Sequence, residues 1–288
     1  MTQPPVPVPL TERLAVGAQY LLPKRLLTEL AGLAAGARLG ALTHAAIRRF
    51  VARYQVDMEE AAEPRIAHYA SFNDFFTRAL KHGVRPLARS EYVCPVDGAI
   101  SQFGAIEQGQ IFQAKGHAYS ALALLGDDLR LAREFDNGQF ATLYLSPRDY
   151  HRIHMPCAGR LESMVHVPGE LFSVNPATAR GVPGLFARNE RVVCAFDTPR
   201  GPLAMVLVGA TIVGSIATVW HGVVNPPRPG TVRRFEYRGQ EIDLDKGAEM
   251  GRFLLGSTVV LLWPHGTLKF SPDWAPGGAI RMGEALGR

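Results

Sequence analysis

The sequence predicts an α+β protein, with basic amphipathic helices at the N-terminus and a mainly β domain of largely antiparallel strands after them. Two observations carry this prediction. Apolar residues recur at helical spacing between residues 11 and 54. From Cys94 onward, short apolar or alternating runs are divided by Gly, Pro, Asn and Asp, which is typical of a sheet-rich domain. We therefore expect a helical region over residues 1–65 and a β-rich domain over residues 66–288.

The N-terminal region is expected to hold two or three helices between residues 11 and 54. The helical spacing is clearest at Leu26, Leu30 and Leu33, and again at Ile47, Phe50, Val51 and Tyr54. A further short helix is expected after Ser71, because Ser71 and Asp74 have the spacing of a capping box. We expect this helix to run on through Leu80 and to end at Gly83, just before Arg85 and Pro86.

Three stretches of the second domain have informative patterns. Residues 203–219 are apolar at successive positions, so strands there are expected to have both faces buried. Residues 253–262 resemble one buried strand, interrupted in the middle by Gly256, Ser257 and Thr258. The segment after Ser271 is rich in Pro and Gly and is expected to wrap the surface.

The positive charge of the chain is concentrated at its beginning. The net charge is +5, and the first 54 residues hold seven Lys or Arg against two Glu, so they account for the whole excess. This asymmetry predicts an anionic partner for the N-terminal region. One interpretation is an interfacial membrane anchor, and the alternative is that the helices merely cover the main domain. Nucleic acid is not expected, because these Leu- and Ala-rich helices carry no aromatic or Arg-rich reading surface.

Composition and missing motifs exclude several classes of protein. The three cysteines, Cys94, Cys157 and Cys194, form no C-x-x-C pair, which argues against a disulfide framework and a zinc site and suits a reducing compartment. No apolar run approaches the roughly 20 residues of a membrane-spanning helix. The motifs G-x-S-x-G, H-E-x-x-H, G-x-G-x-x-G and Walker A do not occur, so the common hydrolases, metalloproteases and nucleotide-binding proteins are not expected.

The Gly256–Ser257 pair allows two interpretations. One is a β-bulge with a hydrogen-bonded serine. The other is a self-cleaving peptide bond, in which Gly256 permits a backbone geometry that a Cβ would forbid. The Ser257 hydroxyl would attack the Gly256 carbonyl, and the resulting ester would eliminate to dehydroalanine. Hydrolysis would then leave a pyruvoyl group at a new chain start.

Three other side chains are candidates for the same chemistry. Asp97 lies in an Asp-Gly pair, which by itself also fits an ordinary turn. His151 and His154 are three residues apart, in a segment that has a proline on either side. Strand geometry would therefore point their rings to opposite faces. A surface pair of histidines is the simpler alternative, and no metal is expected, because no third ligand has recognisable spacing. Asp97, His154 (or His151) and Ser257 supply the elements of a triad, which depends on geometry and not on chain order.

Many ordered motifs between Ser71 and Pro264 carry a resemblance to a known family. They are Phe72-Asn73-Asp74-Phe75-Phe76-Thr77-Arg78, Pro95-Val96-Asp97-Gly98, Lys115-Gly116 with Tyr119-Ser120, Asp149-Tyr150-His151-Arg152-Ile153-His154-Met155-Pro156, Phe172-Ser173-Val174-Asn175, Phe186-Ala187-Arg188-Asn189-Glu190-Arg191 and Leu255-Gly256-Ser257-Thr258. With these motifs the chain resembles the phosphatidylserine decarboxylase proenzymes, of the membrane-associated bacterial and mitochondrial type. The first 60 residues are similar only in being helical, basic and apolar.

The resemblance implies self-cleavage between Gly256 and Ser257. Asp97, His154 and Ser257 match the family's charge-relay set for this step. Cleavage would give a large chain (1–256) and a small chain (257–288) headed by a pyruvoyl cofactor derived from Ser257. The two chains would form a heterodimer, which can pair further into a homodimer.

The resemblance also implies the reaction and its place. The amine of phosphatidylserine would form a Schiff base with the pyruvoyl group, and loss of CO2 would lead to phosphatidylethanolamine in phospholipid biosynthesis. His151 matches a histidine associated with decarboxylation, as proton donor. The Phe172–Asn175 motif and Lys115 are expected near the lipid headgroup. The protein would sit peripherally on the anionic cytoplasmic face of the cell membrane.

Two alternatives remain open at this point. One is a pyruvoyl-dependent decarboxylase of a soluble amino acid, which would act without lipid. The other is a catalytically silent membrane-binding β-module, which would remain one intact chain.

Overall fold

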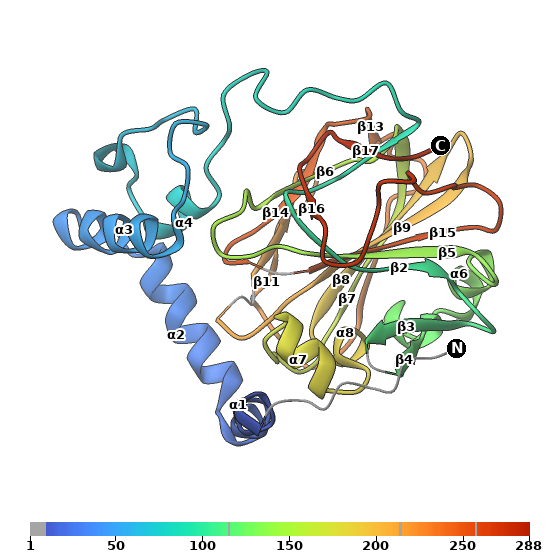
Figure 1. Cartoon of the computed structure of the whole chain (residues 1–288), viewed down its shortest axis with the longest axis horizontal. Helices are drawn as coiled ribbons and strands as arrows, with labels where there is room; N and C mark the ends of the chain where they lie inside the picture. Colours follow the sequence, from blue (N-terminus) through green and yellow to red (C-terminus); the bar gives the residue numbers. More distant parts are fainter. Residues whose placement is uncertain (1–9, 115, 213–214, 257) are drawn as a thin grey trace.

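The computed structural model describes residues 10–114, 116–212, 215–256 and 258–288. The first three helices lie along one side of the molecule, and most strands lie on the other (Figure 1). The sheets are antiparallel, so the predicted α+β class is confirmed. Ser257 and Lys115 lie outside the described residues.

The N-terminal region folds into helices at the positions expected from the apolar spacing. Its helices are α1 (Leu10–Leu21), α2 (Lys24–Gly36) and α3 (Ala41–Tyr54). Shorter helices follow: a 3-10 turn (Ile66–His68), α4 (Phe72–Phe76), α5 (Ala121–Leu124), α6 (Leu129–Glu134), α7 (Pro176–Gly181) and α8 (Leu185–Arg188). Ser71 and Asp74 form the predicted capping box, but α4 ends at Phe76, well before the expected end.

In the part of the chain that the structure describes, the strands form one large sheet and three smaller ones. The strands are β1 (Tyr92–Val93), β2 (Gly98–Ala105), β3 (Gln110–Ala114), β4 (His117–Ser120), β5 (Gln139–Tyr144), β6 (Arg152–His154), β7 (Gly159–Val167), β8 (Arg191–Thr198), β9 (Gly201–Val208), β10 (Ile216–Thr218), β11 (Gly222–Asn225), β12 (Arg233–Glu236), β13 (Asp243–Leu244), β14 (Glu249–Phe253), β15 (Thr258–Trp263), β16 (Ala279–Ile280) and β17 (Ala285–Gly287). The large sheet has the order β12-β7-β8-β9-β15-β5-β2-β16, with β13 also paired to β7. The smaller sheets are β11-β10-β14-β6, β1-β17 and β3-β4.

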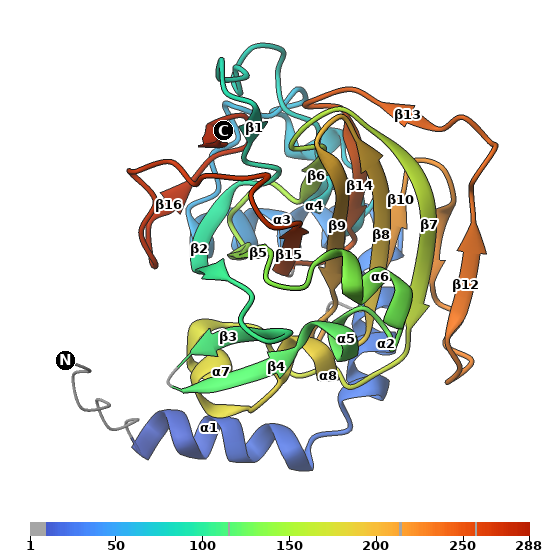
Figure 2. The same cartoon turned by 90° about the vertical axis from the view of Figure 1, so that its right-hand side faces the viewer.

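Strand β15 lies inside the large sheet, between β9 and β5, and is buried along its whole length. Its side chains alternate between two cores. Val259 and Leu261 face a core shared with the four-stranded sheet and the C-terminal segment. Val260 and Leu262 face a second core, covered by the short helices and the β3–β4 hairpin (Figure 2). Strand β9 alternates in the same way, which confirms the prediction for residues 203–208. The rest of the run 203–219 was predicted wrongly, since Ile212 and Val219 are exposed and β10 is only half-buried on one face.

A third, smaller core joins the N-terminal helices to the β-rich domain. Its buried members are Ala35, Ile47, Val56, Tyr69, Phe75, Phe76 and Leu255. Leu255 directly precedes Gly256, so the helices pack against the segment that contains the predicted cleavage site. This core includes residues from both sides of the expected domain boundary at residue 65. The division into 1–65 and 66–288 therefore stays a prediction.

The C-terminal segment differs from its prediction. We expected it to wrap the surface, but β16 pairs with β2 and β17 pairs with β1. Ile280 and Leu286 are buried in the first core. The burial of these two apolar residues packs the segment against the β-rich domain.

Candidate active site

The predicted cleavage site lies at a crossing between two sheets. Residues 253–262 are not one strand, because β14 ends at Phe253 in the four-stranded sheet and β15 begins at Thr258 in the large sheet. Leu255 has a φ of +154° and Gly256 a φ of +21°. A non-glycine residue rarely adopts such a backbone conformation, which is found mainly at functional sites.

His151 is the histidine next to Gly256. Its Nδ1 donates to the Asp149 carbonyl at 2.7 Å, which leaves Nε2 as the unprotonated nitrogen of a neutral ring. Nε2 lies 3.1 Å from the position that a Cβ on Gly256 would occupy. It is buried and has no hydrogen-bond partner among the described residues. The ring packs against Phe76, with the ring centroids 4.1 Å apart.

The surroundings of His151 keep its ring neutral. Burial lowers the pKa of His151 to about 3, and the nearby Arg78 charge lowers it further, against the opposing effect of the Asp149 hydrogen bond. A buried, neutral nitrogen without a partner is costly, because it has lost its hydrogen bond to water. Such a group is a candidate for an acid–base role.

His154 has different partners. Its Nδ1 donates to the Gly247 carbonyl at 2.8 Å, and its Nε2 accepts from the Tyr150 hydroxyl at 3.0 Å. Burial lowers the pKa of His154 as well. The two histidines therefore do not share a hydrogen-bond partner, in agreement with the expectation that their rings need not share one task.

Asp97 is held by groups that the sequence analysis did not identify. Its carboxylate accepts from Arg85 Nε at 3.0 Å, from Arg85 Nη2 at 2.6 Å and from the Met282 amide at 2.8 Å. Arg85 also binds Glu60 at 2.6 Å. Among the residues that the structure describes, no hydrogen bond joins Asp97 to His154. The two are neighbours nevertheless, since the His154 amide donates to the Pro95 carbonyl at 2.9 Å.

A pocket of about 540 Å³ opens on Gly256, between the N-terminal helices and the large domain. Apolar residues make up most of its wall: Ala31, Ala34, Ala35, Ala46, Phe50, Phe72, Phe76, Leu145, Pro147, Val174, Ala210, Ile212 and Leu255. Its polar groups include Ser173, Asn175 and Thr211. Part of the Phe172–Asn175 motif, predicted near the substrate, thus lies in the same pocket as Gly256.

Comparison with known proteins agrees with these features. A family model described as phosphatidylserine decarboxylase matches residues 72–288, and a second, described as PSD, matches residues 14–55. The chain belongs to the phosphatidylserine decarboxylase family. It is therefore a carboxy-lyase by family, and the two alternatives left open by the sequence are not favoured.

The family's curated members cover almost the whole chain. A phosphatidylserine decarboxylase proenzyme of Methylibium petroleiphilum is 69% identical over 96% of this chain and 98% of its own length. Proenzymes of the same name from an Azoarcus species and from Dechloromonas aromatica are 68% and 65% identical over 96% of this chain. The word proenzyme implies that these relatives are processed by cleavage.

Two residues of the site in this decarboxylase family member gave no signal in the sequence. Arg85 appeared only as the residue before Pro86, and Tyr150 only as part of a motif. Arg85 stands in a loop, 12 residues before Asp97, so no periodic pattern connects the two.

Proposed function

We propose that this chain is the precursor of a phosphatidylserine decarboxylase that cleaves itself between Gly256 and Ser257 and converts Ser257 to a pyruvoyl group. Membership of the family and the proenzyme names of its relatives support the proposal. The observation that carries it is the buried Nε2 of His151, which faces Gly256 without a described partner.

The proposed cleavage needs no external reagent except water. The Ser257 hydroxyl oxygen attacks the Gly256 carbonyl carbon, so an ester bond forms and the peptide C–N bond breaks. Elimination then breaks the Ser257 Cβ–O bond, which releases the Gly256 carboxylate and leaves dehydroalanine. Hydrolysis removes the nitrogen as ammonia and leaves a ketone at the head of chain 257–288. The large chain, 1–256, stays bound to it as a heterodimer.

The surroundings of Gly256 suit a pyruvoyl group. The absence of a Cβ at Gly256 leaves room beside the His151 ring, and the buried His151 Nε2 is an acceptor with no partner among the residues that the structure describes. The pyruvoyl group supplies a carbonyl that accepts the electron pair released as CO2 leaves. His151 holds a neutral nitrogen that can take up and return a proton, while Phe76 and Leu255 exclude water from one side.

We assign the two histidines to successive steps. His154, with Asp97, is proposed to activate Ser257 in the precursor. His151 is proposed to deliver a proton to the substrate carbon after CO2 has left. The different hydrogen-bond partners of the two rings support this division.

A phospholipid substrate agrees with the form of the pocket. Its wall of Ala and Phe side chains has little to offer free serine, whereas it can receive the apolar part of a lipid. Phosphatidylserine as substrate gives phosphatidylethanolamine and CO2. The polar side chains of Ser173, Asn175 and Thr211 are proposed to contact the headgroup.

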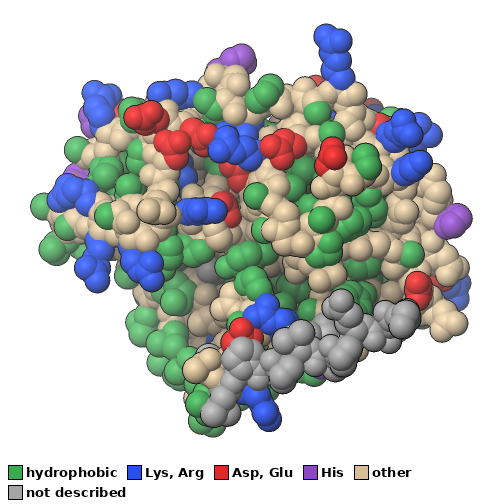
Figure 3. All heavy atoms as spheres, viewed as in Figure 1, with side chains coloured by type: hydrophobic (Ala, Val, Ile, Leu, Met, Phe, Trp, Pro, Cys, Tyr) green, Lys and Arg blue, Asp and Glu red, His purple; other side chains and the backbone are tan. Residues whose placement is uncertain are grey.

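We further propose that the protein lies peripherally on the anionic cytoplasmic face of the cell membrane. Large apolar side chains of α1–α3 are exposed, including Leu21, Leu33 and Leu42. Figure 3 displays hydrophobic side chains gathered at the lower left, where α2 lies, with Lys and Arg beside them. Among the described residues no single helix is long and apolar enough to cross a bilayer, although α2 and α3, bent by 113°, meet the criterion as a pair.

Replacement of Ser257 by Ala tests the proposed function. The variant lacks the attacking hydroxyl, so we expect it to stay one chain and to release no CO2 from phosphatidylserine. The wild type should be inhibited by hydroxylamine, which traps carbonyls. Cleavage of Ser257→Ala at the usual site would contradict the mechanism, and release of CO2 from free serine at a comparable rate would contradict the lipid substrate.

A further inference from the structure

Two loops of the large domain form the wall of the pocket opposite α2 and α3. One spans residues 171–175 and the other residues 209–212; we call them the first and the second pocket loop. Ser173 and Asn175 of the first, and Thr211 and Ile212 of the second, line the pocket together with Gly256. The shape of the substrate site therefore depends on what holds these loops.

The inner ends of both loops are held by one side chain. Asn189 is fully buried, and its Nδ2 donates to the Phe172 carbonyl at 2.8 Å and to the Gly209 carbonyl at 2.9 Å. Its Oδ1 accepts from the Phe172 amide at 3.1 Å. Asn189 thus fixes where the two loops leave the core, which gives a structural role to the centre of the Phe186–Arg191 motif.

The outer parts of the loops are held by the N-terminal helices instead. Gln19 of α1 accepts from the Ser173 amide at 2.9 Å through Oε1 and donates to Thr178 Oγ1 at 3.0 Å through Nε2. Thr28 of α2, which is 3% exposed, accepts from the Ile212 amide at 3.0 Å. Each helix therefore contributes one uncharged polar side chain to one loop.

The backbone of Ile212 is strained, and this strain indicates what its hydrogen bond with Thr28 does. Ile212 has a φ of +71°, a region that β-branched residues strongly avoid. Such a conformation persists only where the surroundings impose it. The hydrogen bond that the Ile212 amide donates to Thr28 is one of the contacts that impose it, so its loss should let this loop relax.

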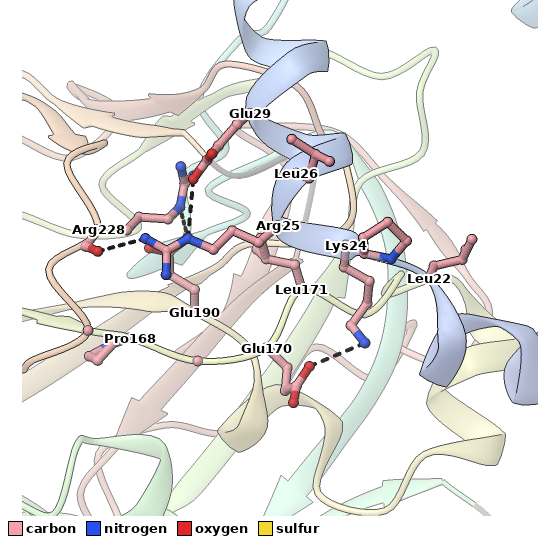
Figure 4. A pocket seen from close by; sticks show the side chains of 13 residues that line it. Leu22, Lys24, Arg25, Leu26, Glu29, Pro168, Glu170, Leu171, Glu190 and Arg228 are labelled. Atoms are coloured by element: carbon pink, nitrogen blue, oxygen red, sulfur yellow. Dashed lines mark hydrogen bonds and ion pairs between the residues drawn. The ribbon is translucent and has the colours of Figure 1, made fainter.

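The same helices present their other faces outward. On α2, Thr28 and Ala35 are buried, whereas Leu26, Leu30 and Leu33 are exposed. The beginning of α2 is also fixed to the large domain. Lys24 Nζ lies 3.3 Å from a Glu170 oxygen, and Arg25 donates to the Arg228 carbonyl at 2.8 Å (Figure 4). These contacts line a second pocket, drawn in Figure 4, and Glu170 directly precedes the first pocket loop, so the start of α2 is anchored beside that loop.

We propose that Gln19 and Thr28 are positioning residues, which couple the outward-facing N-terminal helices to the two pocket loops and so set the substrate site. The proposal rests on the proposed function, because it concerns a pocket that takes a lipid. A bilayer that receives the exposed leucines holds α1 and α2 in place, and the helices in turn hold the loops through these two side chains.

The test uses the full chain and three pocket variants with a matched control. Thr28→Val and Gln19→Leu keep the approximate size of the side chain and remove the acceptor. Thr28→Ser restores the hydroxyl without the methyl group. Thr43→Val is the control, because Thr43 is 6% exposed but accepts from the Leu39 amide, just before its own helix, α3.

Hydrogen exchange of the amides in the pocket loops is the first measurement. We expect amide 212 in Thr28→Val and amide 173 in Gln19→Leu to exchange faster by a factor of roughly 3 to 10, the effect of losing one neutral hydrogen bond. Thr28→Ser should exchange like the wild type, and Thr43→Val should leave both loops unchanged. Vesicles of phosphatidylcholine and phosphatidylglycerol should slow exchange in the wild-type loops, and less so in Thr28→Val and Gln19→Leu.

Kinetics on phosphatidylserine vesicles is the second measurement. Both variants should still be cleaved into two chains, and their apparent KM should rise by roughly 3- to 10-fold with a smaller change in kcat. Unchanged exchange at residues 173 and 212, or an equal change in Thr43→Val, would overturn the proposal. If the wild type released no CO2 from phosphatidylserine, the proposed function would fail, while the exchange data would still decide whether Gln19 and Thr28 position the loops.

Discussion

His151 and His154 stand three residues apart, yet their ring nitrogens meet different groups. His151 leaves Nε2 free of described partners beside Gly256, whereas both ring nitrogens of His154 are bonded, to Gly247 and Tyr150. His151 lies next to the cleavage site, although we assign it to the step that follows cleavage. Single substitutions can separate the two roles.

We expect His154→Ala and Asp97→Ala to accumulate as the uncleaved precursor, because both residues are assigned to activation of Ser257. His151→Ala should still be cleaved, at least in part, but should decarboxylate about 10² to 10⁴ times more slowly, the usual cost of losing a general acid. A denaturing gel measures cleavage, and CO2 release from phosphatidylserine measures activity. Blocked cleavage in His151→Ala with normal cleavage in His154→Ala would reverse the assignment.

The pH dependence of stability tests the environment of His151. Its pKa is lowered from 6.5 to about 3, so between these values the unfolded chain binds a proton that the folded chain excludes. The stabilising effect of this group is therefore complete above pH 6.5 and is lost as the pH falls toward 3. At pH 5 the loss is about 2 kcal/mol, because one pKa unit corresponds to about 1.4 kcal/mol.

Denaturant unfolding at pH 7 and pH 5 measures this effect. The free energy of unfolding of Ser257→Ala, which keeps the chain in one piece, should fall more between these pH values than that of Ser257→Ala/His151→Asn. Equal losses in the two proteins would mean that His151 is not buried in its neutral form.

The motifs in the sequence singled out Asp97, His151 and His154 as candidates, and their catalytic roles stay predictions. The sequence did not indicate the partners of Asp97. Arg85 and Met282 reach Asp97 from a loop and from the C-terminal segment, and neither has a periodic relation to it. Contacts between irregular segments leave no pattern in the sequence.

At the scale of elements, α2 and α3 were well predicted, because each has its own apolar periodicity. The apolar run 253–262 was not, since it was expected to form one strand and instead comprises the last residue of β14, a crossing segment and most of β15. Both strands are buried, so their side chains are apolar on either side of the crossing. Gly256, Ser257 and Thr258, which interrupt the apolar run, mark the crossing in the sequence.

The exposed arginines of α3 predict how strongly the protein binds anionic membranes. Reversal of Arg48, Arg49 and Arg53 to Glu should weaken binding to anionic vesicles by more than about a hundredfold. Each exposed cation near an anionic surface contributes about 1 kcal/mol, and each new Glu adds repulsion. Wild-type binding should also weaken with salt, since the Debye length is about 8 Å at physiological ionic strength. Sedimentation with phosphatidylglycerol vesicles measures both effects.

A matched control separates local from total charge. Reversal of Arg130, Arg133 and Lys269, which are exposed in the β-rich domain, changes the net charge equally and should leave binding nearly unaffected. Equal binding of the wild type to neutral and anionic vesicles would show that apolar insertion, and not charge, dominates.

At the scale of the whole molecule, the α+β class followed from composition and pattern, whereas the sheet order did not. The order β9-β15-β5 brings together strands that are far apart in the chain, and nothing local specifies it. This order has a consequence for the proposed cleavage. Strand β15 is hydrogen-bonded on both sides and begins at Thr258, so a break before it leaves the small chain inside the sheet.

The central claim is that the chain cleaves itself between Gly256 and Ser257 and gains a pyruvoyl group there. The most direct test is the mass of the purified wild-type protein, measured under denaturing conditions after elution as one native species. The account predicts two chains, 1–256 and 257–288, with the smaller one lighter by one ammonia than a chain headed by serine and blocked to Edman degradation. A single intact chain of 31.4 kDa, or a small chain that begins with free serine, would contradict it.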